Sequence, residues 1–400
     1  MIIRIAPGTL RGEIQAPPSK SYAHRLLLAA GLARGESILY GVEQSGDLKA
    51  TEACLTALGA EIRHEKNAVI LRGSGKPIKN AVFPAGESAT TLRFFLPLAL
   101  KDGGEAVFSV SPRLKERGIG VYETLFREKG IKTTIENDFI RVTGRLEAGE
   151  YRIRGDVSSQ FASGLLFALP LLKGESRLTL LPPVESRPYI AMTLDVLNKA
   201  EIVTEECAEN IYRVPGGQSC HTLCETVEGD WSNGAVFLAL ASLGHAVGVT
   251  GLREESLQGD RAVTAFLKRL EEKDPVIDLS DTPDLAPILF AAAAAKNGAV
   301  FTGTRRLGIK ESDRAKVMAE ELKKCGVEAA VGENRVTVVG GTLHAPAERL
   351  SAHGDHRVAM ALAALLTLVG GELEGAEAVG KSWPGFWEAL EKLGAPVRYL

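Results

Sequence analysis

The sequence is poor in long apolar runs and in cysteine, and neither sign of charge dominates. No apolar stretch approaches the roughly 18 residues of a membrane span, and the opening MIIRIAPGTL lacks the apolar core of a signal peptide. The five cysteines are an odd and sparse set, which indicates a reducing cytoplasm. A net charge of −3 provides no general attraction to nucleic acid or to anionic membranes. We therefore expect neither as a partner, and any anion site must be built locally.

Metal binding is not expected either. The segment Cys220-His221-Thr222-Leu223-Cys224 brings two cysteines and a histidine together. No second pair of ligands stands at the spacing of a zinc site, so reduced structural thiols are the better interpretation. The composition, 45% apolar and 24% charged, is that of a globular protein, and 400 residues favour two domains.

What the chain does contain is a repeated kind of helix. Six times, a polar and often charged head opens a helix that is apolar on nearly every face and ends in glycine. The spacing is about 70 residues, with one shorter interval. The heads begin near Lys20, Ala89, Ser158, Asp230, Asp284 and Asp355. Such helices are buried, and a helix N-terminus suits an anion, so the heads predict a phosphate or carboxylate site.

Amphipathic helices lie between the buried ones, and most stop at a glycine before a short strand. The period indicates an internally duplicated α/β fold with two halves of three units, each unit holding a buried helix, strands and an amphipathic helix. The predicted domains are residues 1–18 with 229–400, and an inserted 19–228. The hinge is expected near 17–20 and 227–230.

Several heads and loops carry residues that suit anion chemistry. Lys20 begins a helix, where a cation opposes the macrodipole, and a bound anion would offset that cost; a solvated basic helix end is the alternative. Capping explains only one of the serines 158 and 159. Asp284 has either a simple N-cap role or a functional one. Lys310 and Arg314 stand four apart, so a helical register places both on one face, beside Glu311.

Ten segments resemble, in order, the signature of the 5-enolpyruvylshikimate-3-phosphate synthase (3-phosphoshikimate 1-carboxyvinyltransferase) family. They lie within residues 17–386 and read PPSKSYAHR, GESATTLRF, PRLKERGIG, SSQFASGLL, SRPYIAMT, EGDWSNG, TPDLAP, KESDR, DHRVAM and KSWPGF. The combination of DHRVAM, KESDR and PSKS is highly specific. The resemblance implies a monomeric transferase with a two-domain inside-out α/β barrel, three repeats per domain.

The resemblance also implies two sets of ligand-binding residues. Shikimate 3-phosphate would be bound by Lys20, Ser21, Arg25, Ser158, Ser159, Gln160, Ser186, Tyr189, Asp284 and Lys310. Phosphoenolpyruvate would be surrounded by Lys20, Ala89, Arg117, Gln160, Arg314, Arg357 and Lys381. Guanidinium groups suit both phosphate and carboxylate. Because the second set draws on both halves of the chain, ligand binding is expected to drive closure.

The implied reaction belongs to the shikimate pathway, which leads to chorismate and the aromatic amino acids. The enolpyruvyl group of phosphoenolpyruvate moves to the 5-hydroxyl of shikimate 3-phosphate through a tetrahedral intermediate, and phosphate leaves. Two proton handlers are needed, and we assign Asp284 to the 5-hydroxyl and Glu311 to C3. Lys20 and Lys310 would shuttle protons or stabilise developing charge. Which acid performs which step is left open, and no cofactor is required.

Two positions depart from the family pattern. The family usually has glycine at position 89, and the methyl group of Ala89 is expected to narrow the phosphoenolpyruvate end of the pocket. This predicts tolerance of glyphosate, which is longer than phosphoenolpyruvate. Arg306 stands where some members have an asparagine, so we leave it out of the site.

Two alternatives are UDP-N-acetylglucosamine enolpyruvyl transferase and a non-catalytic anion-binding protein. The first typically has a reactive cysteine in the loop that here reads SPRLKER, at residues 111–117, without cysteine. The second would need neither Asp284 nor Glu311. An RNA-cyclase-like relative would be expected to show a basic surface, which the net charge does not favour.

Overall fold

The computed structural model describes residues 1–77, 79–341 and 343–400. They form two compact units, which we call unit 1 (residues 1–17 and 229–400) and unit 2 (residues 18–228). Each unit has its own apolar core. No helix among the described residues is both long and apolar enough to cross a membrane.

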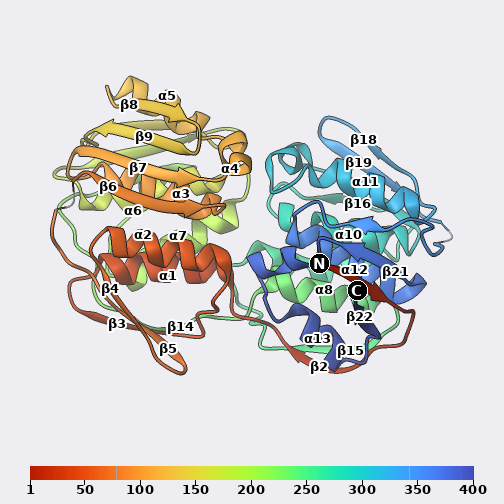
Figure 1. Cartoon of the computed structure of the whole chain (residues 1–400). Helices are drawn as coiled ribbons and strands as arrows, with labels where there is room; N and C mark the ends of the chain where they lie inside the picture. Colours follow the sequence, from red (N-terminus) through yellow and green to blue (C-terminus); the bar gives the residue numbers. More distant parts are fainter. Residues whose placement is uncertain (78, 342) are drawn as a thin grey trace. The chain divides into compact units, whose positions relative to one another are not determined.

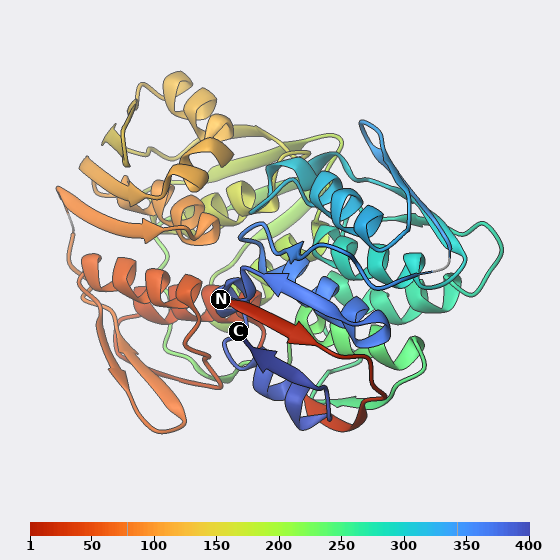
Figure 2. The same cartoon turned by 45° about the vertical axis from the view of Figure 1, so that its right-hand side comes forward.

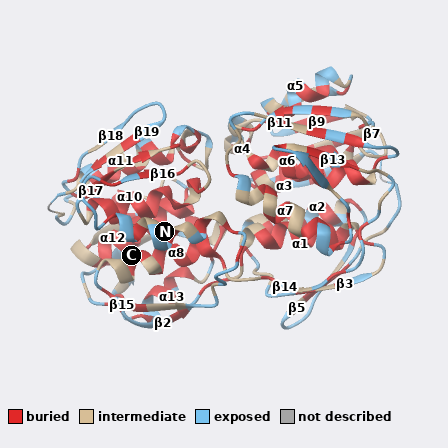
Figure 3. Cartoon of the chain, turned by 180° about the vertical axis from the view of Figure 1, so that it is seen from behind, coloured by how far each residue is buried: buried red, intermediate tan, exposed pale blue. Residues whose placement is uncertain are grey.

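All six predicted apolar helices are present and buried, as the red ribbons of α3, α6 and α10 illustrate in Figure 3. In unit 2 they are α1 (Lys20–Leu32), α3 (Ala89–Ala99) and α6 (Ser159–Ala168); in unit 1 they are α8 (Trp231–Ser242), α10 (Ala286–Ala294) and α12 (His356–Val369). Five begin with a side-chain cap, in which Ser19, Ser88, Ser158, Asp230 or Asp355 accepts a backbone N–H. The exception is α10, which begins from a 3₁₀ turn at Pro283–Leu285 without a side-chain cap.

The amphipathic helices follow the predicted plan. They are α2 (Gly46–Ala57), α5 (Gly120–Glu128), α7 (Arg187–Lys199), α9 (Val263–Arg269), α11 (Arg314–Lys324) and α13 (Phe386–Lys392). The glycines that follow α2, α5, α11 and α13, at positions 59, 130, 326 and 394, all have left-handed φ, the conformation glycine adopts without strain. After α7 the same position is taken by Glu201, at φ 58°.

Each repeat places its buried helix beside a pair of parallel strands, and in every sheet of the described residues except that of β15 (Ala246–Thr250) and β2 (Arg11–Gln15) antiparallel strands extend that pair (Figure 1). The sheets of unit 2 are, in spatial order, β14 (Cys224–Thr226), β3 (Glu36–Tyr40), β5 (Ala68–Arg72), β4 (Glu61–His64); β6 (Ala81–Gly86), β7 (Gly104–Val110), β9 (Phe139–Gly144), β8 (Lys132–Glu136); and β10 (Glu150–Arg154), β11 (Ser176–Leu181), β13 (Ile211–Val214), β12 (Glu205–Ala208). The first two strands of each sheet are parallel. Two of these pairs are βαβ units, β6–α3–β7 and β10–α6–β11, whereas β3, which follows α1, pairs with β14 from the end of unit 2.

Unit 1 repeats this plan with one shortened member. Its sheets are β15 (Ala246–Thr250), β2 (Arg11–Gln15); β16 (Val276–Asp278), β17 (Gly298–Thr302), β19 (Arg335–Val339), β18 (Ala329–Val331); and β20 (Leu350–Ser351), β21 (Gly371–Glu374), β1 (Ile2–Ile5), β22 (Val397–Tyr399). The N- and C-terminal strands lie side by side as antiparallel neighbours (Figure 2). All residues between α9 and β16 are described, and they form no β-hairpin. The missing hairpin explains why the interval between the helix heads at Asp230 and Asp284 is shorter than the others.

Candidate active site

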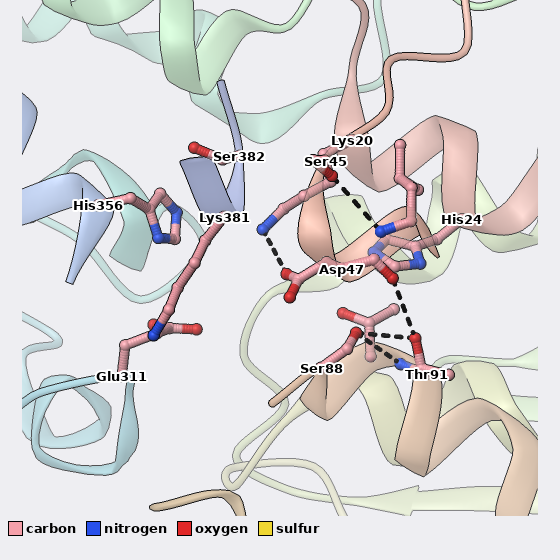
Figure 4. Close-up of polar contacts among 12 residues, drawn as sticks. Lys20, His24, Ser45, Asp47, Ser88, Thr91, Glu311, His356, Lys381 and Ser382 are labelled. Atoms are coloured by element: carbon pink, nitrogen blue, oxygen red, sulfur yellow. Dashed lines mark hydrogen bonds and ion pairs between the residues drawn. The ribbon is translucent and has the colours of Figure 1, made fainter. Parts of the chain in front are cut away.

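Lys20, the first residue of α1, has a carboxylate partner within unit 2. Its Nζ lies 2.7 Å from Oδ2 of Asp47, in the first turn of α2 (Figure 4). An acidic residue is favoured in that first turn by the α2 dipole, and the ion pair offsets the unfavourable position of Lys20 on α1. The sequence predicted an external anion for this purpose, and the structure adds Asp47.

Arg25 lies one turn further along α1 and is almost completely buried. Its guanidinium donates to Oγ1 of Thr193 at 2.8 Å and to the carbonyl oxygens of Ser21 and Tyr189, with a longer bond to Oγ of Ser163. These acceptors are all neutral. Burial lowers the pKa of Arg25 to about 10, yet the group stays cationic at neutral pH. The arrangement holds a buried positive charge at a predicted anion site.

Gln160 is oriented by a residue that the sequence prediction missed. Arg93 of α3 donates to Oε1 of Gln160 at 2.8 Å and, more weakly, to Oγ of Ser158. The Gln160 amide nitrogen donates to Oγ1 of Thr90 at 2.8 Å. Arg93 also donates to the carbonyl oxygen of Arg117, the last residue of α4 (Pro112–Arg117). One buried arginine thus connects α3, α6 and the end of α4.

Other predicted residues of unit 2 stand at helix starts. Ala89 and Ser159 are buried first residues of α3 and α6. Ser186 precedes α7 with a left-handed φ of 58°, and the ring of Tyr189 lies against the guanidinium of Arg25. Of the two serines at the head of α6, Ser158 is the N-cap, and Ser159 is the first residue of the helix.

Asp284 is the centre of a charged cluster in unit 1. Its Oδ1 lies 3.1 Å from Nζ of Lys310 and 2.7 Å from Nη1 of Arg314, and its Oδ2 lies 4.0 Å from Nη2 of Arg357. Asp284 belongs to the 3₁₀ turn before α10, and the N-cap positions of the turn and of the helix are Thr282 and Leu285, so the N-cap alternative is wrong. Burial disfavours the charged carboxylate, but the three cations outweigh burial and hold the pKa of Asp284 well below its usual value.

Arg314 joins Asp284 to the head of α12. Its guanidinium contacts Oε2 of Glu311 at 2.9 Å and Oδ2 of Asp355 at 2.8 Å. The predicted helical register of Lys310 and Arg314 is wrong, because α11 begins at Arg314 and Lys310 lies in the preceding loop. Both cations nevertheless contact Asp284, so the loop before α11 brings Lys310 and Arg314 together, as a helical face was expected to do. Burial lowers the pKa of Lys310, although Asp284 opposes that change.

The head of α8 also contributes to this cluster. Asn233 of α8 accepts a hydrogen bond from Nη1 of Arg357 at 2.9 Å through its Oδ1. The backbone N–H of Arg357 donates to Asp355, the cap of α12. Lys381 donates to the carbonyl oxygen of Gly354 at 3.0 Å, next to that cap. Neighbouring repeats of unit 1 thereby support one another's charged side chains.

Arg306, which the sequence left out of the site, is buried and donates to the carbonyl oxygen of Ser280. The structure therefore presents it as a support for a loop. Among the described residues, no group of three or more histidine, cysteine or acidic side chains is arranged to hold a metal ion. Cys220 and Cys224 are free thiols.

Comparison with known proteins agrees with this geometry. The model of the family described as EPSP synthase (3-phosphoshikimate 1-carboxyvinyltransferase) matches residues 5–274 and 271–390. The chain belongs to the EPSP synthase family. A 3-phosphoshikimate 1-carboxyvinyltransferase of Clostridium kluyveri is 37% identical over 99% of this chain and 98% of its own length. One of Clostridium acetobutylicum is 35% identical with the same coverage.

The solved structures confirm the fold. An EPSP synthase of Acinetobacter baumannii superposes with a TM-score of 0.79 over 99% of both chains, at 23% identity. The predicted α/β architecture of the EPSP synthase family, with repeated units of buried helix, strands and amphipathic helix, is thus confirmed. The match covers both units and all six repeats.

The supporting residues of this EPSP synthase family member were the ones that sequence reasoning missed. Asp47, Arg93 and Asn233 each lie inside a helix that periodicity describes well, and their polarity looked like ordinary surface or capping chemistry. For Arg93 there was one signal, a charged residue within an otherwise apolar buried helix. For Asp47 there was none beyond an acidic first turn.

Proposed function

We propose that this chain catalyses the reaction of the EPSP synthase family, the transfer of the enolpyruvyl group of phosphoenolpyruvate to the 5-hydroxyl of shikimate 3-phosphate with release of phosphate. The observation that carries the proposal is the cluster of Asp284 with Lys310, Arg314 and Arg357, in a chain whose relatives carry this activity over their full length. A purely anion-binding protein would need the cations but not an ionised carboxylate among them.

We assign the anion-binding roles by charge. Arg25 and Lys20 would bind the anionic groups of shikimate 3-phosphate, because Arg25 keeps its charge against neutral partners and the ammonium group of Lys20 is a compact cation with three N–H donors. Arg357 and Lys381 would take the phosphate and carboxylate of phosphoenolpyruvate, for which guanidinium and ammonium donors suit both groups. Arg117 would join them, as the family resemblance implies.

The remaining shikimate 3-phosphate residues would act as neutral donors and acceptors. Ser21, Ser158, Ser159, Ser186 and Tyr189 all stand in the first turn of a helix or immediately before one. Helix N-termini also present unpaired backbone N–H groups, which bind phosphate oxygens. This combination supports an anionic, hydroxyl-rich ligand.

Proton transfer would use the acids and the lysine of unit 1. Asp284, held ionised, would accept the proton of the 5-hydroxyl as that oxygen attacks C2 of phosphoenolpyruvate. Glu311 would deliver a proton to C3 and take one back when phosphate leaves. Lys310 suits a shuttle, because its lowered pKa brings it closer to neutral pH. Lys20 would stabilise charge that develops on the phosphate.

Four further predictions concern the domains, the hinge, the oligomeric state and the location. The domains would be residues 1–18 with 229–400, and 19–228, and the hinge would lie near 17–20 and 227–230. The protein would be a monomer in the cytoplasm. Small-angle scattering with and without both ligands tests the first three together. A more compact monomer with both ligands bound is the expected result. No change on ligand binding would contradict the hinge.

The activity itself is tested by phosphate release from phosphoenolpyruvate, with shikimate 3-phosphate or UDP-N-acetylglucosamine as the acceptor. Release with the first acceptor alone is expected, and release only with the second would overturn the proposal. For Asp284→Ala we expect kcat to fall by at least about 100-fold. Calorimetry should show that this variant still binds shikimate 3-phosphate. A variant with full activity would remove Asp284 from the mechanism.

A further inference from the structure

One of the buried carboxylates of unit 1, that of Asp260, has no part in the mechanism above. Asp260 lies in the 3₁₀ turn Gly259–Ala262 before α9, and only 2% of it is exposed. Ser232 of α8 donates its hydroxyl to Oδ2 of Asp260 in a short hydrogen bond. The other oxygen, Oδ1, is buried without a hydrogen-bond partner among the described residues. An ionised carboxylate with one bare buried oxygen is costly, whereas a protonated one is much less so.

The charged groups around Asp260 come from several elements. Asp284 and Asp230 act on it as negative charges, and Arg357 acts as the positive one. On its own turn, Arg261 points to the carbonyl oxygen of Glu254. The charged residues of α9, at positions 268 and 269, are exposed. Two carboxylates therefore act on Asp260 against one close cation.

The cations of this region favour Asp284 over Asp260. Asp284 contacts Lys310 and Arg314 directly, whereas Asp260 has a single hydroxyl donor. Burial, followed by the negative charge of Asp284, raises the pKa of Asp260 to about 7 against the pull of Ser232 and Arg357. A buried carboxylate and a partly buried one that interact in this way do not both ionise freely.

We propose that Asp260 is a positioning residue that holds a proton in the ligand-free protein, so that the negative charge of the pair Asp260 and Asp284 rests on Asp284. The inference rests on the proposed function, in which Asp284 must be ionised to accept the proton of the 5-hydroxyl. Asp260 does not touch the substrate. It acts through Asp284 and Arg357, by staying neutral next to them.

The proposal sets a direction for pH dependence. As the pH rises through about 7, Asp260 ionises and adds a second negative charge to the electrostatic surroundings of Arg357. Anionic phosphoenolpyruvate then binds less well, so its KM rises. The pKa of Asp260 in the folded protein lies above the usual value of 3.8, so the folded protein binds this proton more tightly than the unfolded chain does. The contribution of Asp260 to the free energy of unfolding is therefore full below pH 3.8 and is lost as the pH rises through the folded-state pKa.

Titration of the ligand-free protein tests the proton directly. With ¹³C-labelled aspartate carboxyl groups, NMR should show one aspartate with a pKa near 7. That resonance should be missing in Asp260→Asn and should titrate at lower pH in Asp284→Asn, which removes the repelling charge. In Ser232→Ala it should titrate at higher pH, because the stabilising hydroxyl is gone. An Asp260 resonance that titrates near 3.8, or that ignores Asp284→Asn, would overturn the proposal.

Kinetics test the consequence. In Asp260→Asn, the rise in KM for phosphoenolpyruvate above neutral pH should disappear, because asparagine reproduces the neutral side chain. Glu271→Gln is the matched control, an exposed carboxylate paired with Lys296, and should keep the wild-type profile. A KM that rises equally in Asp260→Asn and wild type would refute the positioning role. Since the NMR titration uses no substrate, its success in an inactive protein would refute only the proposed function.

Discussion

The buried arginines of the two units solve the same physical problem in opposite ways. Arg314 of unit 1 contacts three carboxylates, those of Asp284, Glu311 and Asp355. Arg25 of unit 2 is equally buried, but it donates to hydroxyl and carbonyl oxygens, and the rings of Phe94 and Tyr189 lie against its guanidinium. Both therefore carry a charge away from water, and only one of them has it neutralised by the protein.

The difference shows in the pKa values. The pKa of Arg314 is held well above its usual value, because Asp355, Glu311 and Asp284 outweigh burial. Burial instead lowers that of Arg25. A neutralised cluster is rigid and suits groups that exchange protons, whereas an unneutralised cation keeps its charge available for an anionic ligand. We read unit 1 as the proton-handling side and unit 2 as an anion-binding side of the proposed chemistry.

The largest effect that tests this difference between the two buried arginines is expected at Arg314. We expect Arg314→Met to lower the free energy of unfolding of unit 1 by about 3–5 kcal/mol, because it leaves buried carboxylates without their partner. Urea denaturation followed by tryptophan fluorescence measures this, since all three tryptophans, Trp231, Trp383 and Trp387, belong to unit 1. Arg349→Met is the control.

Arg349 is half-exposed and pairs with Glu372, so its loss should cost less than about 1 kcal/mol. Equal effects of the two substitutions would mean that the buried network contributes no more than a surface ion pair.

The counterpart substitution in unit 2 is Arg25→Met. We expect a change in stability within about 1 kcal/mol, because no carboxylate is left unpaired and Ser163 and Thr193 still bond to each other at 2.7 Å. Affinity for shikimate 3-phosphate should fall by about 10- to 100-fold, the value of hydrogen bonds to a charged group. Hydrogen exchange of unit 2 and calorimetry measure the two effects. A loss of stability as large as that of Arg314→Met would remove the distinction between the units.

A smaller effect is expected at the head of α3. Ala89→Gly should increase inhibition by glyphosate about tenfold, because removing a methyl group from a tight contact relieves about 1–3 kcal/mol of overpacking. The KM for phosphoenolpyruvate should change little. Ala99→Gly, at the other end of the same helix, is the control and should leave inhibition unchanged. Equal glyphosate sensitivity of wild type and Ala89→Gly would contradict the prediction that the Ala89 methyl group confers tolerance.

The smallest effect concerns the end of α7 in unit 2. Its Glu201 adopts the left-handed φ that glycine supplies after α11 of unit 1, at Gly326. Glu201→Gly should therefore stabilise the protein by about 0.5 kcal/mol, the relief of left-handed strain less the entropy cost of glycine. Thermal denaturation measures the gain. Glu201→Ala keeps the Cβ atom and should give none, so an equal gain in both variants would point to the lost carboxylate instead.

Periodicity predicted every buried helix, every amphipathic helix and four of the glycine stops, because these features depend on residues close in sequence. It failed where loops intervene. The four-residue spacing of Lys310 and Arg314 suggested a helical face, but α11 begins only at Arg314. It also could not find Asp47 or Asn233, whose partners Lys20 and Arg357 belong to other helices.

By itself, the sequence determined which segments are helical and which of them are buried, because propensity and hydrophobic periodicity act within a few residues. The structure decided the caps: Ser158 rather than Ser159 caps α6, and α10 has no side-chain cap. Only the tertiary structure decided which charges meet. Asp284 gathers three cations while Asp260, in the same unit, receives one hydroxyl. Which carboxylate contacts the cations depends on how packing orients each side chain. The electrostatic energy between buried charges depends steeply on the distance between them.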